Sequence, residues 1–167
     1  PADHPGLAGG DVTGLASTGA GLVVTTADSV ALFDGNAFVR ISDSGAVSLA
    51  HAPLDGGIEA VAATSRGVLL IKDGIVAGTV QPAKDIVSAA GYGSFLYYVT
   101  YEGLFAYDLG LGIETLLAGM AGLRSVATDG LDVFAGGTAN EDYSLPLVKL
   151  AYPMGASQTL GPDVHGI

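Results

Sequence analysis

Residues 86–100 read IVSAAGYGSFLYYVT, and three other stretches of the chain align with them without gaps. These are VTGLASTGAGLVVTT at 12–26, IEAVAATSRGVLLIK at 58–72 and LRSVATDGLDVFAGG at 123–137. Each begins with a branched aliphatic residue and has alanine at its fifth position (Ala16, Ala62, Ala90 and Ala127). Residues 161–167 match residues 9–15 at four positions, as though a fifth copy began there. Self-similarity of this kind is the signature of a repeat architecture.

Each copy has the pattern of a meander of short antiparallel strands. In the third copy, apolar segments at 86–90, 95–100, 104–107 and 113–117 are separated by glycine-containing turns. The first copy also predicts four strands, whereas the second spans only 28 residues and predicts three. The fourth carries an insertion from Gly136 to Ser144 between its second and third strands. No segment has the apolar spacing of a helix, so we expect almost no helix.

A meander cannot bury both of its faces alone, and repeated meanders solve this by packing face to face around an axis. The copies start near 12, 58, 86 and 123, and these spacings bracket the roughly 40–45 residues of a propeller blade. We therefore predict an all-β chain. It forms a single domain over 1–167, a β-propeller-like array of about four short antiparallel meander blades. Crowding near the axis would favour the recurring alanine.

Two segments of the third copy resemble a known propeller repeat. FLYYVT at 95–100 followed by LFAYDL at 104–109 is similar to the YVTN-type β-propeller repeat, and LFD at 32–34 is a weaker echo. The resemblance implies a fold and no ligand. Three arrangements remain open: a closed small propeller, part of a larger propeller, or an open array that closes through a partner subunit. We favour the second, because the chain ends as a fifth copy begins.

The composition excludes several classes of partner. The net charge is −11 with only six lysines and arginines, which disfavours nucleic acid and anionic membrane surfaces. The absence of cysteine excludes disulfides, thiolate metal sites and cysteine nucleophiles. His4, His51 and His165 are not paired at the spacing of a metal site, and no G-x-S-x-G elbow is present. We expect no metal, no cofactor and no catalytic residue.

The insertion of the fourth copy holds the candidate binding residues Glu141, Asp142 and Tyr143. Loops on a rigid scaffold often carry function, and clustered oxygen ligands could contact calcium or another ligand. Tyrosines provide a second signal. Alternation places Tyr97 and Tyr98 on opposite faces of one strand, and we expect one in the core and the other at a groove or interface.

These observations predict a protein that is not an enzyme. We expect a structural or binding module that assembles with other protein subunits as a homo- or hetero-oligomer. A virion component, such as a viral tail or nozzle protein, or an extracellular cell-surface component fits best. The alternative is a propeller enzyme or small-ligand sensor whose site lies at one mouth of the central channel. Glu59, Asp85 and Arg124 come near the ends of first strands, where such a site would lie.

Overall fold

The chain folds into four antiparallel sheets of four strands each in the computed structural model, which describes residues 7, 10–82, 84–138, 147–151 and 155–159. The first sheet contains β1 (Val12–Thr18), β2 (Gly21–Thr26), β3 (Val30–Phe33) and β4 (Phe38–Ser42). The second contains β5 (Ala46–Leu54), β6 (Ile58–Thr64), β7 (Gly67–Lys72) and β8 (Ile75–Val80). The third contains β9 (Ile86–Tyr92), β10 (Phe95–Thr100), β11 (Gly103–Asp108) and β12 (Ile113–Ala118). The fourth contains β13 (Leu123–Thr128), β14 (Asp132–Gly137), β15 (Leu147–Ala151) and β16 (Gly155–Thr159).

The all-β prediction is therefore confirmed. Among the described residues the one helical element is a short 3-10 turn at Asp55–Gly57. The four segments predicted in the third copy coincide with β9 to β12 within two residues at each end. Within each sheet the strands follow chain order, as expected for meanders.

The copy that begins at Ile58 contains the three predicted strands, β6 to β8. Its sheet has a fourth strand that was not predicted, because residues 46–54 form β5 and pair with β6. The copy that begins at Ile58 therefore falls on the second strand of its sheet, whereas the other three begin on first strands. The copy aligns with first strands elsewhere because two hairpins have similar sequences. Ala62 faces Leu69 across β6 and β7 just as Ala90 faces Tyr97 across β9 and β10, so the two hairpins look alike in sequence.

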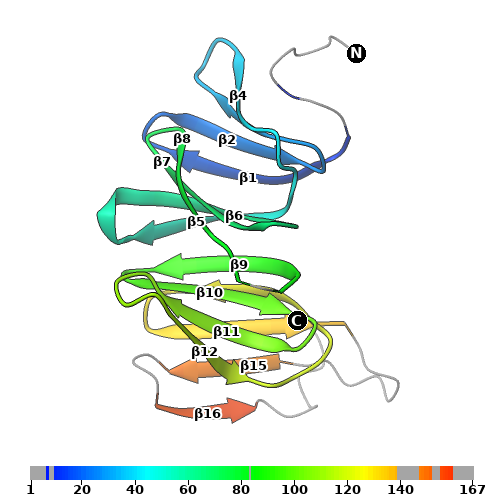
Figure 1. The fold of residues 1–167 in the computed structure, drawn as a ribbon, viewed down its shortest axis with the longest axis vertical. Helices are drawn as coiled ribbons and strands as arrows, with labels where there is room; N and C mark the ends of the chain where they lie inside the picture. The colour runs from blue at the N-terminus through cyan, green and yellow to red at the C-terminus, as the bar shows by residue number, and fades with distance from the viewer. Residues whose placement is uncertain (1–6, 8–9, 83, 139–146, 152–154, 160–167) are drawn as a thin grey trace.

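The four sheets stack one on another along the longest dimension of the molecule (Figure 1). Their first strands β1, β5, β9 and β13 pack against one another in that order. Small residues permit this approach. A Cβ atom placed on Gly14 of β1 would lie 2.6 Å from the Cβ atom of Leu49 in β5, which is closer than real Cβ contacts allow.

Aspartates close several of the turns between strands. Asp34, Asp108 and Asp129 each accept two hydrogen bonds from backbone N–H groups two and three residues further along. These bonds lower the pKa of Asp34 and Asp129 below the ordinary value of a carboxyl group. The Asp129–Asp132 hairpin thus has the turn role that its sequence indicates.

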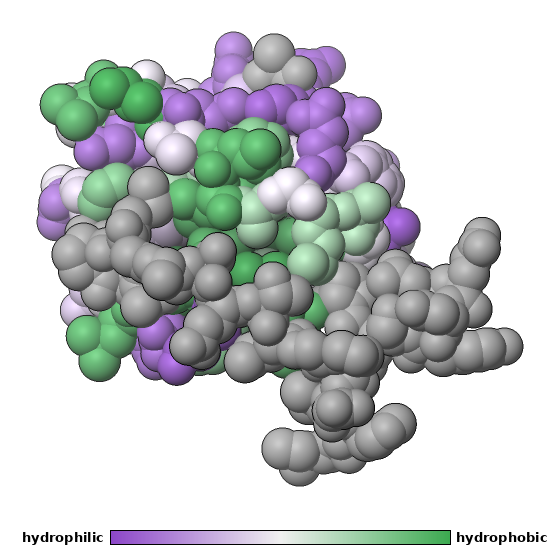
Figure 2. All heavy atoms as spheres, turned by 90° about the horizontal axis from the view of Figure 1, so that it is seen from below, coloured by the Kyte–Doolittle hydropathy of each residue, from purple (hydrophilic) through white to green (hydrophobic). Residues whose placement is uncertain are grey.

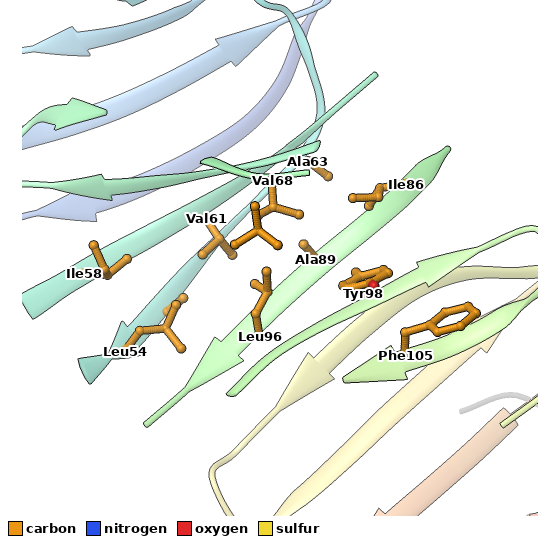
Figure 3. Close-up of a cluster of buried hydrophobic side chains, with 12 residues drawn as sticks. Leu54, Ile58, Val61, Ala63, Val68, Ile86, Ala89, Leu96, Tyr98 and Phe105 are labelled. Atoms are coloured by element: carbon orange, nitrogen blue, oxygen red, sulfur yellow. The ribbon is translucent and has the colours of Figure 1, made fainter. Parts of the chain in front are cut away.

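Three apolar clusters fill the spaces between successive sheets. The cluster between the second and third sheets is built largely of bulky side chains, among them Leu54, Leu96 and Tyr98, which approach one another from both sheets (Figure 3). The cluster between the first and second sheets includes four alanines: Ala16, Ala46, Ala60 and Ala62. The third cluster joins the third and fourth sheets.

The two neighbouring tyrosines of β10 are both in the core. Tyr98 is fully buried against the second sheet, and Tyr97 is 3% exposed against the fourth. The alternation of faces is as predicted, but the expectation that one ring reaches a groove or interface is wrong. Both rings are covered because the third sheet is an inner layer with a neighbour on each side.

Candidate functional site

The binding residues predicted from the sequence, Glu141, Asp142 and Tyr143, lie outside the described residues, so their role stays a prediction. His4 and His165 lie outside them as well, and His51 is exposed on β5. In the part of the chain that the structure describes, no group of three or more histidines and carboxylates could hold a metal ion. No helix there is long and apolar enough to cross a membrane.

A hollow with a volume of about 490 Å³ lies between the second and third sheets. Three segments form its walls: the β6–β7 turn, the link from β8 to β9, and the β10–β11 turn. Its lining residues are Ser65, Arg66, Pro82, Lys84, Asp85, Thr100, Tyr101 and Glu102.

The two turns that face each other across this hollow are built alike. Residues 64–67 read TSRG and residues 100–103 read TYEG. The Thr64 hydroxyl accepts a hydrogen bond from the Arg66 backbone N–H at 3.1 Å, and the Thr100 hydroxyl accepts one from Glu102 at 3.1 Å. Arg66 and Glu102 therefore occupy equivalent positions at the tips of neighbouring turns, with opposite charges. Both side chains are exposed.

A smaller hollow of about 230 Å³ adjoins the first and shares Ser65, Asp85 and Tyr101 with it. Its remaining lining is aliphatic: Val47, Ile86 and Val87. Val47 and Tyr101 are each more than half exposed. The combined site thus has a charged part and an apolar part, with the Tyr101 ring bordering both.

Most of the basic side chains in this acidic chain already have partners. Arg40, Lys84 and Lys149 form ion pairs with Asp43, Glu114 and Asp132, and the Lys72 ammonium donates to a backbone carbonyl. Within the described residues, Arg66 and Arg124 form no ion pair, and their guanidinium groups donate no hydrogen bond. Asp85 and Glu102 likewise have no ion-pair partner there. Both of these guanidinium groups therefore lie near the hollow, which is also lined by two carboxylates without an ion-pair partner among the described residues.

Lys84 lines the hollow but is held by a polar network on the third sheet. Its ammonium lies 2.7 Å from a Glu114 oxygen and 3.8 Å from the centre of the Phe105 ring. The other Glu114 oxygen accepts a hydrogen bond from the Tyr98 hydroxyl. Burial and the neighbouring carboxylate raise the pKa of Tyr98. Burial also pushes the pKa of Glu114 upward, but the hydrogen bonds from Lys84 and Tyr98 outweigh it and lower that pKa.

Arg124 approaches the site from the fourth sheet, with its guanidinium 5.0 Å from the centre of the Tyr101 ring. Of the three residues named for a channel-mouth site, Asp85 and Arg124 thus both lie beside Tyr101. Glu59 does not join them. Its two oxygens accept hydrogen bonds from the backbone N–H groups of Gly19 and Asp73, at 2.7 and 3.0 Å, and so connect turns of the first and second sheets.

Sequence reasoning missed Arg66, Tyr101 and Glu102. A signal was present, because residues 64–67 (TSRG) and 100–103 (TYEG) share a threonine and a glycine at the same spacing. Only the packing of the second sheet on the third brings the two turns to one hollow.

The first and fourth sheets have outer faces that carry apolar side chains. On the first sheet, Leu15 and Leu22 are 60% and 36% exposed, and the Phe33 and Phe38 rings lie 4.9 Å apart beside them in the strand register. On the fourth, Ala127 pairs with Phe134, whose ring lies beneath the Lys149 ammonium. Figure 2 shows the fourth-sheet end of the molecule, where apolar atoms gather centrally and hydrophilic atoms follow one margin.

No protein-family model matches the chain, and no curated protein matches it. Several solved structures share its fold. The extracellular domain of a putative hybrid two-component system from B. thetaiotaomicron is 16% identical, with a TM-score of 0.65 over 93% of this chain and 22% of that one. A computationally designed protein is 15% identical, with a TM-score of 0.60 over 82% of this chain and 89% of that one. Apo AztD from Citrobacter koseri is 12% identical, with a TM-score of 0.55 over 90% of this chain and 48% of that one.

The chain spans about a fifth of the length of the two-component extracellular domain that it matches. At these identities the likeness concerns the fold alone.

Proposed function

We propose that the four sheets are consecutive blades of a β-propeller-like array, and that the chain is a non-catalytic binding module within a larger protein assembly. Support for the array comes from the stacking of β1, β5, β9 and β13 and from the meander order in every sheet. Blades that radiate from a common axis place their first strands next to one another in this way.

The contrast between inner and end sheets carries the proposal. The second and third sheets each bury both faces in apolar clusters. The first sheet instead presents Leu15 and Leu22 outward, on the face opposite Ala16 and Val23. A further sheet that stacked on this face in the same manner would remove its apolar area from water, at roughly 25 cal/mol per Å². The occupant that fits is another protein sheet.

An extracellular location is part of the proposal. The two-component proteins that share the fold are described as extracellular domains. That setting favours a cell-surface assembly over a virion component for this chain.

The test is the solution mass of the chain by light scattering on a sizing column, over a range of concentrations. We expect species larger than the 16.6 kDa monomer at high concentration. The double substitution Leu15→Glu and Leu22→Glu should shift the population toward monomer. The matched control is Leu131→Glu, because Leu131 is 73% exposed but lies in a turn. A wild-type chain that remained monomeric throughout would contradict these faces as binding surfaces.

A second candidate function is the binding of a small ligand, with no chemistry performed on it. The observation that favours it is the hollow lined by Arg66, Asp85, Tyr101 and Glu102, whose charged groups are not paired with one another. Ile86 and Arg124 lie at the starts of β9 and β13, and Val47 lies near the start of β5. In a propeller-like array these strand ends would surround one mouth of the central channel.

A further inference from the structure

We infer that the hollow between the β6–β7 and β10–β11 turns binds a small zwitterion with an apolar side chain, of the size of an amino acid or dipeptide. The ligand's carboxylate lies at Arg66, its ammonium at Asp85 and Glu102, and its apolar group in the aliphatic hollow. This inference deepens the second candidate function and rests on it.

The hollow carries opposite charges on its two walls. Arg66 projects from the second sheet, and Glu102 from the equivalent position on the third, and both border one hollow. Within the described residues they are not within ion-pair distance of each other. A guanidinium is the side chain best suited to hold a carboxylate through two parallel hydrogen bonds. The carboxylates of Asp85 and Glu102 are acceptors for an ammonium.

Singly charged ligands fit this arrangement of charge less well than a zwitterion does. An anion held at Arg66 would lie near two unpaired carboxylates, and a cation held at those carboxylates would lie near the guanidinium. Like charges placed together in a binding site oppose binding. Lys84 does not alter this balance, because its ammonium is paired with Glu114. Arg124 does not alter it either, because its guanidinium lies over the Tyr101 ring and does not line the hollow. A ligand that carries both charges satisfies both walls of the hollow.

An apolar hollow adjoins the charged one. Val47, Ile86 and Val87 line the adjoining hollow of about 230 Å³, which meets the charged hollow at Asp85 and Tyr101. The larger hollow alone, at about 490 Å³, falls within the roughly 300–1,000 Å³ typical of small-molecule sites. Tyr101 is 59% exposed and offers a rigid apolar ring between the two parts. An aliphatic side chain next to an amino or carboxylate group matches this layout.

The experiment is a set of calorimetric titrations of the whole chain with four probes: leucylleucine, N-acetyl-leucylleucine, leucylleucine amide and glycylglycine. The acetylated probe lacks the ammonium, the amide lacks the carboxylate, and glycylglycine lacks the apolar side chains. We expect leucylleucine to bind about tenfold or more tightly than each of the other three, because each lacks one contact that the hollow provides.

Substitutions assign the contacts. Arg66→Met should abolish the preference for leucylleucine over its amide, and Glu102→Gln should reduce its preference over the acetylated probe. The matched control is Arg40→Met, which removes an arginine on β4 of the first sheet and should change neither preference. Unchanged thermal unfolding of each variant would show that the fold is intact.

Two results would overturn the inference, and they are distinguishable. Equal binding of leucylleucine and either charge-blocked probe would refute a zwitterion site and leave a small-ligand function standing. Failure of all four probes at millimolar concentration, with no movement of the Tyr101 ring signals in NMR spectra, would refute both the inference and the second candidate function. Neither result depends on the assembly proposal, which is tested by mass.

Discussion

The third sheet and the first sheet are the same kind of meander, yet they differ in what covers them. In the third, adjacent residues Tyr97 and Tyr98 point to opposite faces and are both buried. In the first, adjacent residues Leu15 and Ala16 also point to opposite faces, but Leu15 is 60% exposed and Ala16 only 6%. Alternation therefore specifies which side chains share a face. Whether that face is core or surface depends on the position of the sheet in the stack.

Removal of the Tyr98 side chain should cause the largest loss of stability among the substitutions that test this difference. Tyr98→Ala would leave a cavity between the second and third sheets and deprive Glu114 of a hydrogen bond, and should cost about 3–5 kcal/mol of unfolding free energy. The matched control Tyr101→Ala removes an exposed ring of the same sheet and should cost about 0.5 kcal/mol or less. Urea denaturation measures both. Similar losses in the two variants would mean that the third sheet is not an inner layer.

The alanines at the fifth position of the copies offer a second test, with an expected loss of stability of intermediate size. Ala90 is 4% exposed between the third and fourth sheets, whereas Ala127 at the aligned position lies exposed on the outer face of the fourth. Ala90→Leu should overpack its site and cost about 1–3 kcal/mol. Ala127→Leu should change stability by about 0.5 kcal/mol or less. Thermal unfolding of the two variants side by side provides the measurement, and an equal cost would argue against the difference in burial.

The smallest expected effect concerns the polar network on the third sheet. The pKa of Glu114 is lowered in the folded chain, so its stabilising contribution is present at neutral pH and is lost as the pH falls below about 4.3, the ordinary glutamate value. Glu114→Gln should therefore destabilise the chain at pH 7, by about 1 kcal/mol or less since the group is partly exposed, and by less at pH 3. Asp43→Asn, at an exposed ion pair of the first sheet, is the control. If the loss of unfolding free energy in Glu114→Gln grew as the pH fell, the pKa of Glu114 could not be lowered by folding.

Much of the local structure was predictable. Apolar alternation and glycine-containing turns located all four strands of the third sheet and of the first to within a few residues. Asp129, in a glycine-containing turn, accepts the two backbone hydrogen bonds that such turns favour. The first strand of the second sheet, β5, was not predicted. Its small and polar residues give only a weak strand pattern, so its pairing with β6 is not evident from the sequence.

The candidate site was only partly predictable. Asp85 and Arg124 are candidates because they lie near the starts of strands. Asp85 lines the hollow, and the Arg124 guanidinium lies beside the Tyr101 ring. Arg66 and Glu102 were not selected, since each sits alone in a turn of its own hairpin. Glu59 was selected on the same basis as Asp85, but its carboxylate is used by two backbone N–H groups.

The strands, their turns and the order of strands within each sheet follow from the amino-acid sequence. These features depend on side-chain alternation and on hydrogen bonds between residues close in the chain, which a local pattern records. The buried faces, the crowded alanines and the charges that meet at one hollow follow instead from the packing of the sheets. Those outcomes depend on how successive sheets stack, and stacking brings together residues such as Arg66 and Glu102 that are distant in sequence and share no local pattern.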